Sequence, residues 1–544
     1  MKHFFLKFIE KIENTPLTLG SFVLAFVALM VTRLTVEGSL EWFQAESFSF
    51  FFFEYTHTFL FFLCSFLLIV PIIRAAGAGT LRKAANLLLF GFLIILTPPF
   101  IDRLIFGAGN YWSFYEFDGL LGLIQRFFTL FGDTPDIGIT YGVRIEVVVV
   151  TLLLGLYTYL KKKHLGKALV IALLVYTVLF IMGTFPSWIT LIVLSFQKGL
   201  LAIRDTDVAA LFLAPERLLG RDLTDFRTVL AVKGSLVYAL FVSGLLSLLL
   251  YREYPRMFFA LIKNARVPQL IYHAGLLFLG ILLAFYFAEG YVQFEFFHLT
   301  GILVLLIATW SAWIASVIGN DLYDTAIDAV TNPNRPLIQD TIPRELYVVF
   351  GIIFFLISLL FAGLVSFSAL LLLLSYQALA WLYSAPPLRL KQYPGLATLC
   401  AATAGILVLV AGFVSVAPSH SITALPLTLL LYLFVAYFLA LPIKDFKDIA
   451  GDKKDGVYTV PVLLGETLGK HVIGSLTFLL FVFSPLVLHA RSLFLPALFF
   501  GSLAFFALQK GTSAEESFYA WRKLPRIILS ITMFYGMIIV FFLS

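Results

Sequence analysis

Charged residues and cysteines are scarce in this chain of 544 residues. Only 13% of the residues are Asp, Glu, Lys or Arg, whereas 60% are hydrophobic and the mean hydropathy is +0.97. The two cysteines, Cys64 and Cys400, both lie inside apolar stretches, which excludes a disulfide framework and a cysteine-based zinc site. The chain also lacks a basic, aromatic-interleaved soluble segment, so we expect no nucleic acid partner.

Long apolar runs are abundant instead. Many of them reach the roughly 20 residues that a helix needs to cross a bilayer. We therefore predict an all-α polytopic membrane protein. Nine spans are expected after residue 256, near 268–287, 298–319, 346–365, 368–384, 396–416, 423–443, 471–489, 492–509 and 525–543. About six more are expected before it, near 16–35, 49–73, 84–101, 140–160, 167–185 and 230–250.

The loops between these spans alternate in charge. Basic residues gather in every second loop, for example at Arg252 to Arg266 and at Lys161 to Lys163, and the net charge of +6 follows from them. The positive-inside rule makes these loops cytoplasmic in an inner or plasma membrane. Six spans in the first part require residues 186–226 to stay on the outer side. We place the boundary between a first membrane domain, 1–251, and a second, 252–544.

Two sets of three aspartates repeat one spacing. Asn320 is followed by Asp321, Asp324 and Asp328, and Asp445, Asp448 and Asp452 keep the same 0, 3, 7 interval. At 3.6 residues per turn, this interval puts the three carboxylates of each set on one helical face. Hard divalent cations prefer such oxygen ligands, and Mg²⁺ is commonly shared between carboxylates and substrate phosphates. The triads predict two halves of one cation site.

Basic residues adjoin both triads. The negative charge of six carboxylates is larger than the positive charge of two Mg²⁺ ions. A bound diphosphate would add further negative charge, so additional cations are needed to balance it. They are available at Arg335, at Arg389 and Lys391, and at Lys444 and Lys447. A lone DxxD at a helix end is more often a pair of solvated carboxylates, but two equal triads beside basic segments favour a cation and phosphate site. Metal and basic groups that stabilise a leaving diphosphate point to ionisation of a C–O bond.

Three segments resemble a known family. NDLYDTAIDAVTNPNRPL at 320–337, YSAPPLRLKQYP at 383–394 and KDFKDIAGDKKDGVYTVPVLLG at 444–465 are similar, in order and spacing, to the motifs of the UbiA superfamily of intramembrane prenyltransferases. The resemblance covers about 256–544. It implies a nine-helix UbiA-like bundle with its motifs in cytoplasmic loops after the second and sixth helices.

The resemblance also implies roles for individual residues. All six aspartates of the triads would bind Mg²⁺, with Asp321, Asp324, Asp445 and Asp448 essential for catalysis. The diphosphate of the donor would be bound by Asn320, Arg335, Arg389, Lys391, Lys444 and Lys447, and Tyr383 would be an aromatic of the substrate pocket. The implied reaction moves an isoprenyl group from an allylic polyprenyl diphosphate to a lipophilic or aromatic acceptor, which the sequence leaves open.

Two other functions use clustered aspartates in membranes. A cation-coupled transporter would use the triads as ion ligands, but transporter sites lie near the midplane rather than beside basic loops. A CDP-alcohol phosphotransferase would need a DGxxAR segment, which the sequence does not contain.

The first half contains ionisable residues within its spans. They are Glu54, His57, Asp102, Arg103, Arg144 and Glu146. Ionisable residues inside spans are functional candidates by default. All of these fall near span ends, however, where pairing and snorkelling are the alternative explanation.

Overall fold

The structure is a computed structural model of the chain. It describes all residues except 1, 42–47, 108–114, 133–137, 289, 291, 294, 326–327, 330–331, 394, 450–457, 511–516 and 544. Some side chains within described helices are also outside the description, among them those of Lys444, Lys447 and Asp448.

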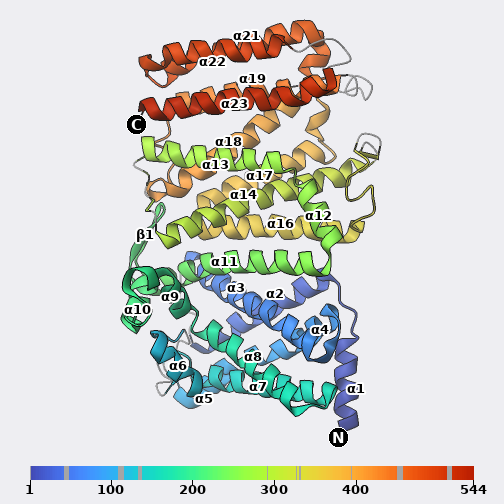
Figure 1. Ribbon diagram of the computed structural model, residues 1–544, viewed down its shortest axis with the longest axis vertical. Coiled ribbons are helices and arrows are strands. Elements are labelled where there is room, and N and C mark those ends of the chain that lie inside the picture. Colours follow the sequence, from blue (N-terminus) through green and yellow to red (C-terminus); the bar gives the residue numbers. More distant parts are fainter. Residues whose placement is uncertain are drawn as a thin grey trace. The chain divides into compact units, whose positions relative to one another are not determined.

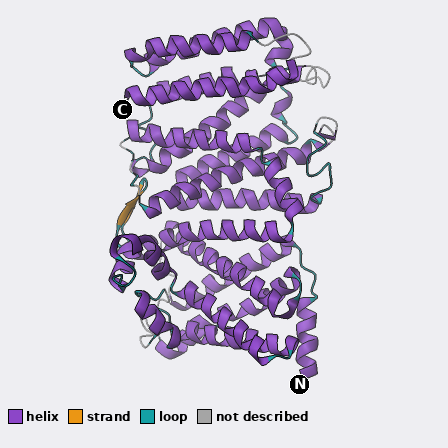
Figure 2. Cartoon of the chain, in the orientation of Figure 1, coloured by secondary structure: helices purple, strands orange, loops and turns teal. Residues whose placement is uncertain are grey.

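Helices account for nearly all of the described chain, with one short strand pair (Figures 1 and 2). The first twelve helices are α1 Lys2–Glu13, α2 Leu19–Glu41, α3 Phe48–Ile73, α4 Leu81–Gly91, α5 Pro98–Phe106, α6 Leu120–Phe128, α7 Tyr141–Lys162, α8 Leu165–Gly183, α9 Phe185–Lys198, α10 Asp205–Leu213, α11 Phe226–Glu253 and α12 Pro255–Asn264. The later ones are α13 Val267–Phe287, α14 Phe296–Tyr323, α16 Arg344–Val365, α17 Phe367–Ser384, α18 Leu396–Val416, α19 Leu427–Ala440, α21 Val460–Val487, α22 Phe494–Gln509 and α23 Ser517–Leu543. The strands are β1 Glu216–Leu218 and β2 Arg221–Leu223.

Thirteen helical stretches among the described residues are long and apolar enough to cross a membrane. The chain is therefore an integral, multi-pass membrane protein, as predicted. Two of the expected spans, 423–443 and 525–543, coincide with the shorter apolar stretches Leu427–Ile443 and Arg526–Ile539. The predicted span 84–101 is not one regular helix, because the chain passes through a 3₁₀ segment at Phe92–Leu96 before α5 begins at Pro98. Proline lacks the N–H that would continue the helix.

The described chain divides into two compact units. The first comprises Met1–Leu218, Asp222–Phe259 and Gln293–Val304, and the second Leu219–Arg221, Ala260–Val292 and Leu305–Ser544.

In the first unit, α3 and α11 pack side by side and run in the same direction. His57 of α3 lies against Gly234 of α11, and further along both helices Arg74, directly after α3, pairs with Glu253. A Cβ at Gly234 would lie only 2.8 Å from His57 Nε2, so the glycine is what allows this approach. Three candidate spans separate the two helices, and a fourth crossing would make them antiparallel. The parallel packing thus agrees with the prediction that residues 186–226, which include the 14-residue α9, do not cross.

In the second unit, α13 and α18 make the closest backbone approach. A Cβ at Gly280 would lie 1.9 Å from the carbonyl oxygen of Leu409, and one at Gly412 would lie 2.1 Å from that of Leu277. Small residues are the usual means by which membrane helices come this close. The indole N–H groups of Trp310 and Trp313, on α14, donate to the carbonyls of Leu270 and Ala265 at 2.9 and 2.7 Å. These contacts hold the end of α14 that carries the first triad beside the start of α13.

Several helices begin where the sequence supplies a cap. The Asp225 carboxylate accepts a hydrogen bond from the Thr228 N–H at 2.8 Å and starts α11, and the Ser366 hydroxyl accepts from the Ala369 N–H at 3.3 Å and starts α17. Proline occupies the first turn of α9, α13 and α21, where its missing N–H has no helical partner to lose.

Candidate functional site

The first triad begins in the last turn of α14 with Asp321 and continues beyond the end of that helix at Tyr323. Backbone hydrogen bonds run from the Asp324 N–H to the Asn320 carbonyl, from Asp328 to Asp324, and from Asn332 to Asp328, at 3.0, 2.8 and 2.8 Å. These three bonds have the i to i+4 spacing of an α-helix. Asp321, Asp324 and Asp328 are 2%, 8% and 4% exposed, so their charges need partners inside the protein.

Asp321 is held by three side chains from three different segments. Its Oδ2 accepts hydrogen bonds from Asn264 Nδ2 at 2.7 Å and from the Tyr347 hydroxyl at 2.8 Å. Its Oδ1 accepts from Arg335 Nη1, which also donates to Asn264 Oδ1 at 3.2 Å. Hydrogen-bond donors of the protein therefore satisfy both oxygens of the Asp321 carboxylate.

Asp324 is compensated by the segment between α17 and α18. Its Oδ1 accepts from Arg389 Nη2 at 2.9 Å, and its Oδ2 accepts from Lys391 Nζ. The same ammonium donates to Asn320 Oδ1 at 2.9 Å, and the Ser384 hydroxyl donates to that oxygen at 3.0 Å. Asn320, Arg389 and Lys391, all predicted members of the site, meet here.

Asp328 is less completely satisfied. Its Oδ1 accepts from Asn332 Nδ2 at 3.0 Å and lies 3.7 Å from Arg335 Nε. Its Oδ2 is buried and has no hydrogen-bond partner among the residues that the structure describes. A buried carboxylate oxygen without a donor is costly unless a cation is brought to it.

Burial also acts on the surrounding cations. Burial lowers the pKa of Lys391 from its ordinary value, and the Asp324 carboxylate acts in the opposite direction. Burial likewise lowers the pKa of Arg266, as does the nearby Arg335 guanidinium. Arg266 and Arg389 both have left-handed backbones, with φ of 56° and 40°. This region is sparsely populated by residues with a Cβ, and such strain concentrates at functional sites.

The second motif begins in a different kind of helix. Leu441–Asp448 form a 3₁₀ helix instead of the α-helix expected from the spacing. Asp445 is half-buried, and the charges of both Asp445 and Asp324 act on the Tyr383 hydroxyl. Asp452 and the side chains of Lys444, Lys447 and Asp448 lie outside the described residues.

The described donor set fits a hard divalent cation. It offers the oxygens of three carboxylates and the Asn320 amide oxygen, with no sulfur or imidazole ligand, and it includes the bare Oδ2 of Asp328. Magnesium prefers oxygen ligands of this kind and leaves positions for substrate phosphates.

Four members of the site were not predicted. Asn264, Arg266, Tyr347 and Ser384 all contact the triad or its partners, or act on them electrostatically. Asn264 and Arg266 lie in the basic segment before α13, which was taken only as a domain boundary and a cytoplasmic marker. A buried asparagine and a tyrosine in the first turn of α16 carry no sequence signal of their own, because only tertiary packing brings them to Asp321.

Carboxylates on a helix end and basic side chains from separate loops define a class of membrane site that can bind a cation and an anion together. Comparison with known proteins identifies the family. Residues 276–535 match the model of the UbiA prenyltransferase family, and the C-terminal half of the chain belongs to it.

Curated relatives agree with this assignment. The digeranylgeranylglyceryl phosphate synthase of Pyrococcus abyssi is 32% identical over 152 residues, which cover 27% of this chain and 50% of the relative. The bacteriochlorophyll synthase 33 kDa chain of Rhodobacter capsulatus is 31% identical over 159 residues, which cover 28% of this chain and 51% of the relative. The chain thus spans about half the length of these relatives. A solved UbiA homologue from Archaeoglobus fulgidus, bound to GPP and Mg²⁺, aligns with 52% of this chain and 99% of its own at 18% identity and a TM-score of 0.39.

Proposed function

We propose that the second unit is a Mg²⁺-dependent intramembrane prenyltransferase that uses an allylic polyprenyl diphosphate as donor. The observation that carries the proposal is the column of three buried carboxylates faced by Arg335, Arg389 and Lys391. The family match over 276–535 supports the same reaction class.

In the proposed reaction, the C–O bond between the allylic carbon and the diphosphate breaks, and the diphosphate leaves with the electron pair. The acceptor nucleophile forms the new bond to the allylic carbon and loses its proton. Bound Mg²⁺, held by the aspartates, would neutralise charge on the leaving diphosphate. Arg389 and Lys391 would turn from Asp324 to diphosphate oxygens, and Arg335 would do so from Asp321 and Asp328.

The remaining residues position these groups. Asn264 and Tyr347 keep Asp321 fixed when Arg335 moves, because their hydrogen bonds reach Oδ2 and leave Oδ1 to the guanidinium. The Tyr383 ring, near both motifs, would stabilise the allylic cation through its π face. The second motif would complete the metal site through Asp445, Asp448 and Asp452, with Lys444 and Lys447 beside the diphosphate.

For the acceptor, the proposal names only a chemical class. The relatives are named for a glyceryl phosphate lipid and for bacteriochlorophyll, so a lipophilic acceptor in the bilayer is favoured over a water-soluble one. We expect the site to face the cytoplasm, because the basic loops around it follow the positive-inside rule.

Cation-coupled transport is a weaker alternative. Carboxylates that already face guanidinium and ammonium groups have little attraction left for a transported monovalent ion. The described geometry therefore favours the enzyme.

The test is a donor and acceptor screen with the purified full chain in lipid nanodiscs. Radiolabelled geranylgeranyl and farnesyl diphosphates are offered with a glycerol phosphate prenyl ether, a chlorophyllide or an aromatic quinone precursor, with Mg²⁺ or with EDTA. We expect diphosphate release and a labelled apolar product for one acceptor, only with Mg²⁺. Release without any metal, or sodium-driven uptake into vesicles in place of product, would overturn the proposal.

A further inference from the structure

We propose that the first unit contains a separate binding site for an amphipathic lipid whose headgroup donates hydrogen bonds. The site is a cavity of about 860 Å³ whose lining residues all belong to that unit. A well-packed interior has few voids larger than a water molecule, so a space of this size is a built feature. It has the volume of a ligand pocket.

The cavity is elongated and has an apolar body. On α3 it is lined from Glu54 through Phe61 and Ser65 to Ile69. Fifteen residues at 1.5 Å each correspond to about 22 Å along the helix, which is more than half of the ~30 Å hydrocarbon core of a bilayer. Phe92, Leu88 and Leu154 continue the lining. A long hydrocarbon chain fits this shape and chemistry.

The polar residues of the lining gather toward one end of the spans. Glu54 and His57 lie in the first turns of α3, Glu146 near the start of α7 and Arg227 at the start of α11. The opposite ends of these helices carry Arg74, Lys161 to Lys163 and Arg252. The cavity therefore has a polar mouth and an apolar interior, as an amphipathic ligand requires.

Several polar groups at the mouth are paired, whereas a buried carboxyl oxygen of Glu54 is not. Arg33 forms an ion pair with Glu37 at 2.9 Å. His57 Nε2 lies 2.8 Å from the Tyr115 hydroxyl, which lies 2.9 Å from that of Tyr238. Glu54 Oε1 is buried and has no hydrogen-bond partner within the described part of the chain.

The unpartnered Glu54 oxygen favours a donor headgroup. Three acidic side chains, Glu37, Glu54 and Glu146, and two basic ones, Arg33 and Arg227, line the mouth. Hydroxyl or ammonium groups of a headgroup would supply the hydrogen bond that Glu54 Oε1 lacks.

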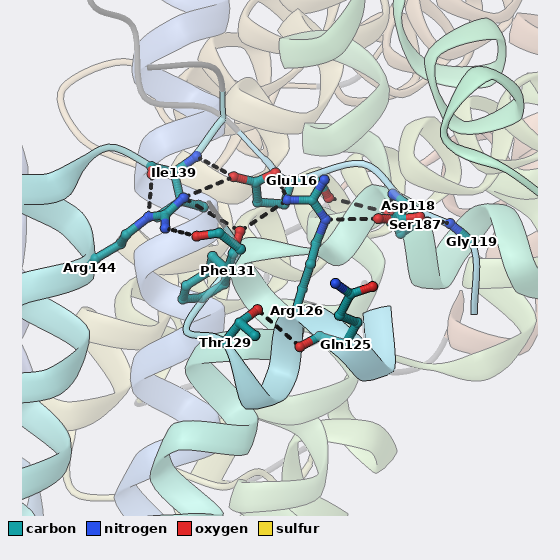
Figure 3. A network of polar contacts seen from close by, with 11 residues as sticks. Glu116, Asp118, Gly119, Gln125, Arg126, Thr129, Phe131, Ile139, Arg144 and Ser187 are labelled. Atoms are coloured by element: carbon teal, nitrogen blue, oxygen red, sulfur yellow. Dashed lines mark hydrogen bonds and ion pairs between the residues drawn. The ribbon is translucent and has the colours of Figure 1, made fainter. Parts of the chain in front are cut away.

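A network of polar contacts around Glu116, Arg126 and Arg144 supports one wall of the cavity; Figure 3 shows the network itself. Glu116 pairs with Arg126 at 2.8 Å and with Arg144 at 3.6 Å, and burial raises the pKa of this carboxyl against the lowering effect of Arg126. Arg144 Nε donates to the carbonyl of Ile139 at 2.9 Å, and Arg126 donates to that of Phe131 at 3.0 Å. Tyr115, Phe131 and Ile139 all line the cavity. The network fixes the backbone that carries them, so the cavity is preformed.

The test measures which lipids the purified full chain retains. The protein is exchanged in detergent against an equimolar mixture of dioleoyl lipids with glucosyl, phosphoethanolamine and phosphocholine headgroups, and bound lipid is quantified by native mass spectrometry. We expect at least tenfold enrichment of the glucosyl or the ethanolamine lipid over the choline lipid, which has no hydrogen-bond donor, since one hydrogen bond to a charged group corresponds to about that factor.

Two substitutions of Glu54 distinguish an ammonium headgroup from a sugar headgroup as the hydrogen-bond donor. Glu54→Gln keeps an oxygen acceptor but removes the charge, so it should abolish enrichment of an ammonium lipid and largely preserve that of a sugar lipid. Glu54→Leu should abolish both. Glu10→Leu is the matched control, because Glu10 is exposed and does not line the cavity.

A substitution that fills the cavity tests the proposal independently of Glu54. A Cβ at Gly91, which lines the cavity at the end of α4, would meet nothing within 4 Å, and the same holds at Gly244 of α11, which does not line it. We expect Gly91→Phe to lower retention of the enriched lipid at least fivefold and Gly244→Phe to leave it unchanged, with equal thermal unfolding. Equal retention of the three lipids in the wild type, or enrichment that survives Glu54→Leu and Gly91→Phe, would mean annular lipid only and would overturn the inference.

Discussion

Two buried ion networks, one in each unit, use the same residue types in opposite ways. In the first unit, Arg126 and Arg144 bind Glu116 and also donate to the main-chain carbonyls of Phe131 and Ile139 (Figure 3). In the second unit, the described partners of the side-chain nitrogens of Arg335, Arg389 and Lys391 are all side-chain oxygens.

The difference separates a structural network from an exchangeable one. An arginine that leaves a buried main-chain carbonyl strands an acceptor that cannot turn to another donor, so the departure is costly. A cation bound to side chains alone can turn to a phosphate without disturbing the backbone. The partners of an arginine therefore indicate its role better than its burial does.

The largest expected effect is on turnover in the second unit. Asp324→Ala removes the acceptor shared by Arg389 and Lys391 and a proposed metal ligand, and Asp448→Ala does the same for the second motif. Both should lower diphosphate release by at least about 100-fold, since electrostatic stabilisation of the leaving group is lost. Asp340→Asn is the control, because Asp340 is exposed and its φ of 50° suits asparagine. Wild-type rates of diphosphate release in both alanine variants would rule out a catalytic site built from the two triads.

The next effect is on stability and belongs to the first unit. Arg126→Met leaves the buried Glu116 and the Phe131 carbonyl without this partner, so we expect a loss of about 3 kcal/mol in the free energy of unfolding. Arg335→Met should cost less stability, because Asn264 and Tyr347 still bind Asp321, but should impair turnover. Thermal unfolding and diphosphate release, measured on both variants, check the contrast. If Arg335→Met is the more destabilising change, the two networks do not differ in kind.

A smaller effect, on the KM for the donor, should show whether Arg389 acts through its charge or through the geometry of its guanidinium group. Arg389→Lys keeps the charge but loses the planar donor set, and we expect the KM for the donor to rise about tenfold with little change in kcat. Arg389→Gln should raise it further. Titration of the donor at saturating acceptor gives both constants. An unchanged KM in Arg389→Gln would show that this cation does not reach the diphosphate.

The smallest effect concerns the side chains that hold Asp321. Tyr347→Phe removes one of two hydrogen bonds to Oδ2 and should lower stability by about 1 kcal/mol with a modest loss of kcat. Asn264→Leu removes bonds to both Asp321 and Arg335 and should lower kcat more. Equal kinetics in the two variants would mean that Asn264 does not position Arg335.

The sequence predicted the helical class and grouped the first triad with basic residues that contact it in the structure. It could do so because hydropathy and the 0, 3, 7 spacing are local properties of the chain. It missed Asn264 and Tyr347, since their role depends on contacts across 57 and 26 positions of the chain. It treated Glu54 and His57 as interface residues, because periodicity cannot reveal a cavity. The roles of Asp452, Lys444 and Lys447 stay predictions.

The left-handed backbone at Arg389 has a consequence for engineering. At φ of 40° a glycine or asparagine would be less strained than an arginine, so a search for stabilising substitutions would select this position. The same substitution would remove a cation that faces Asp324. A variant such as Arg389→Gly should therefore relieve the local backbone strain but leave Asp324 to Lys391 and lose donor affinity, so the strain at this residue is the cost of holding a cation at the site.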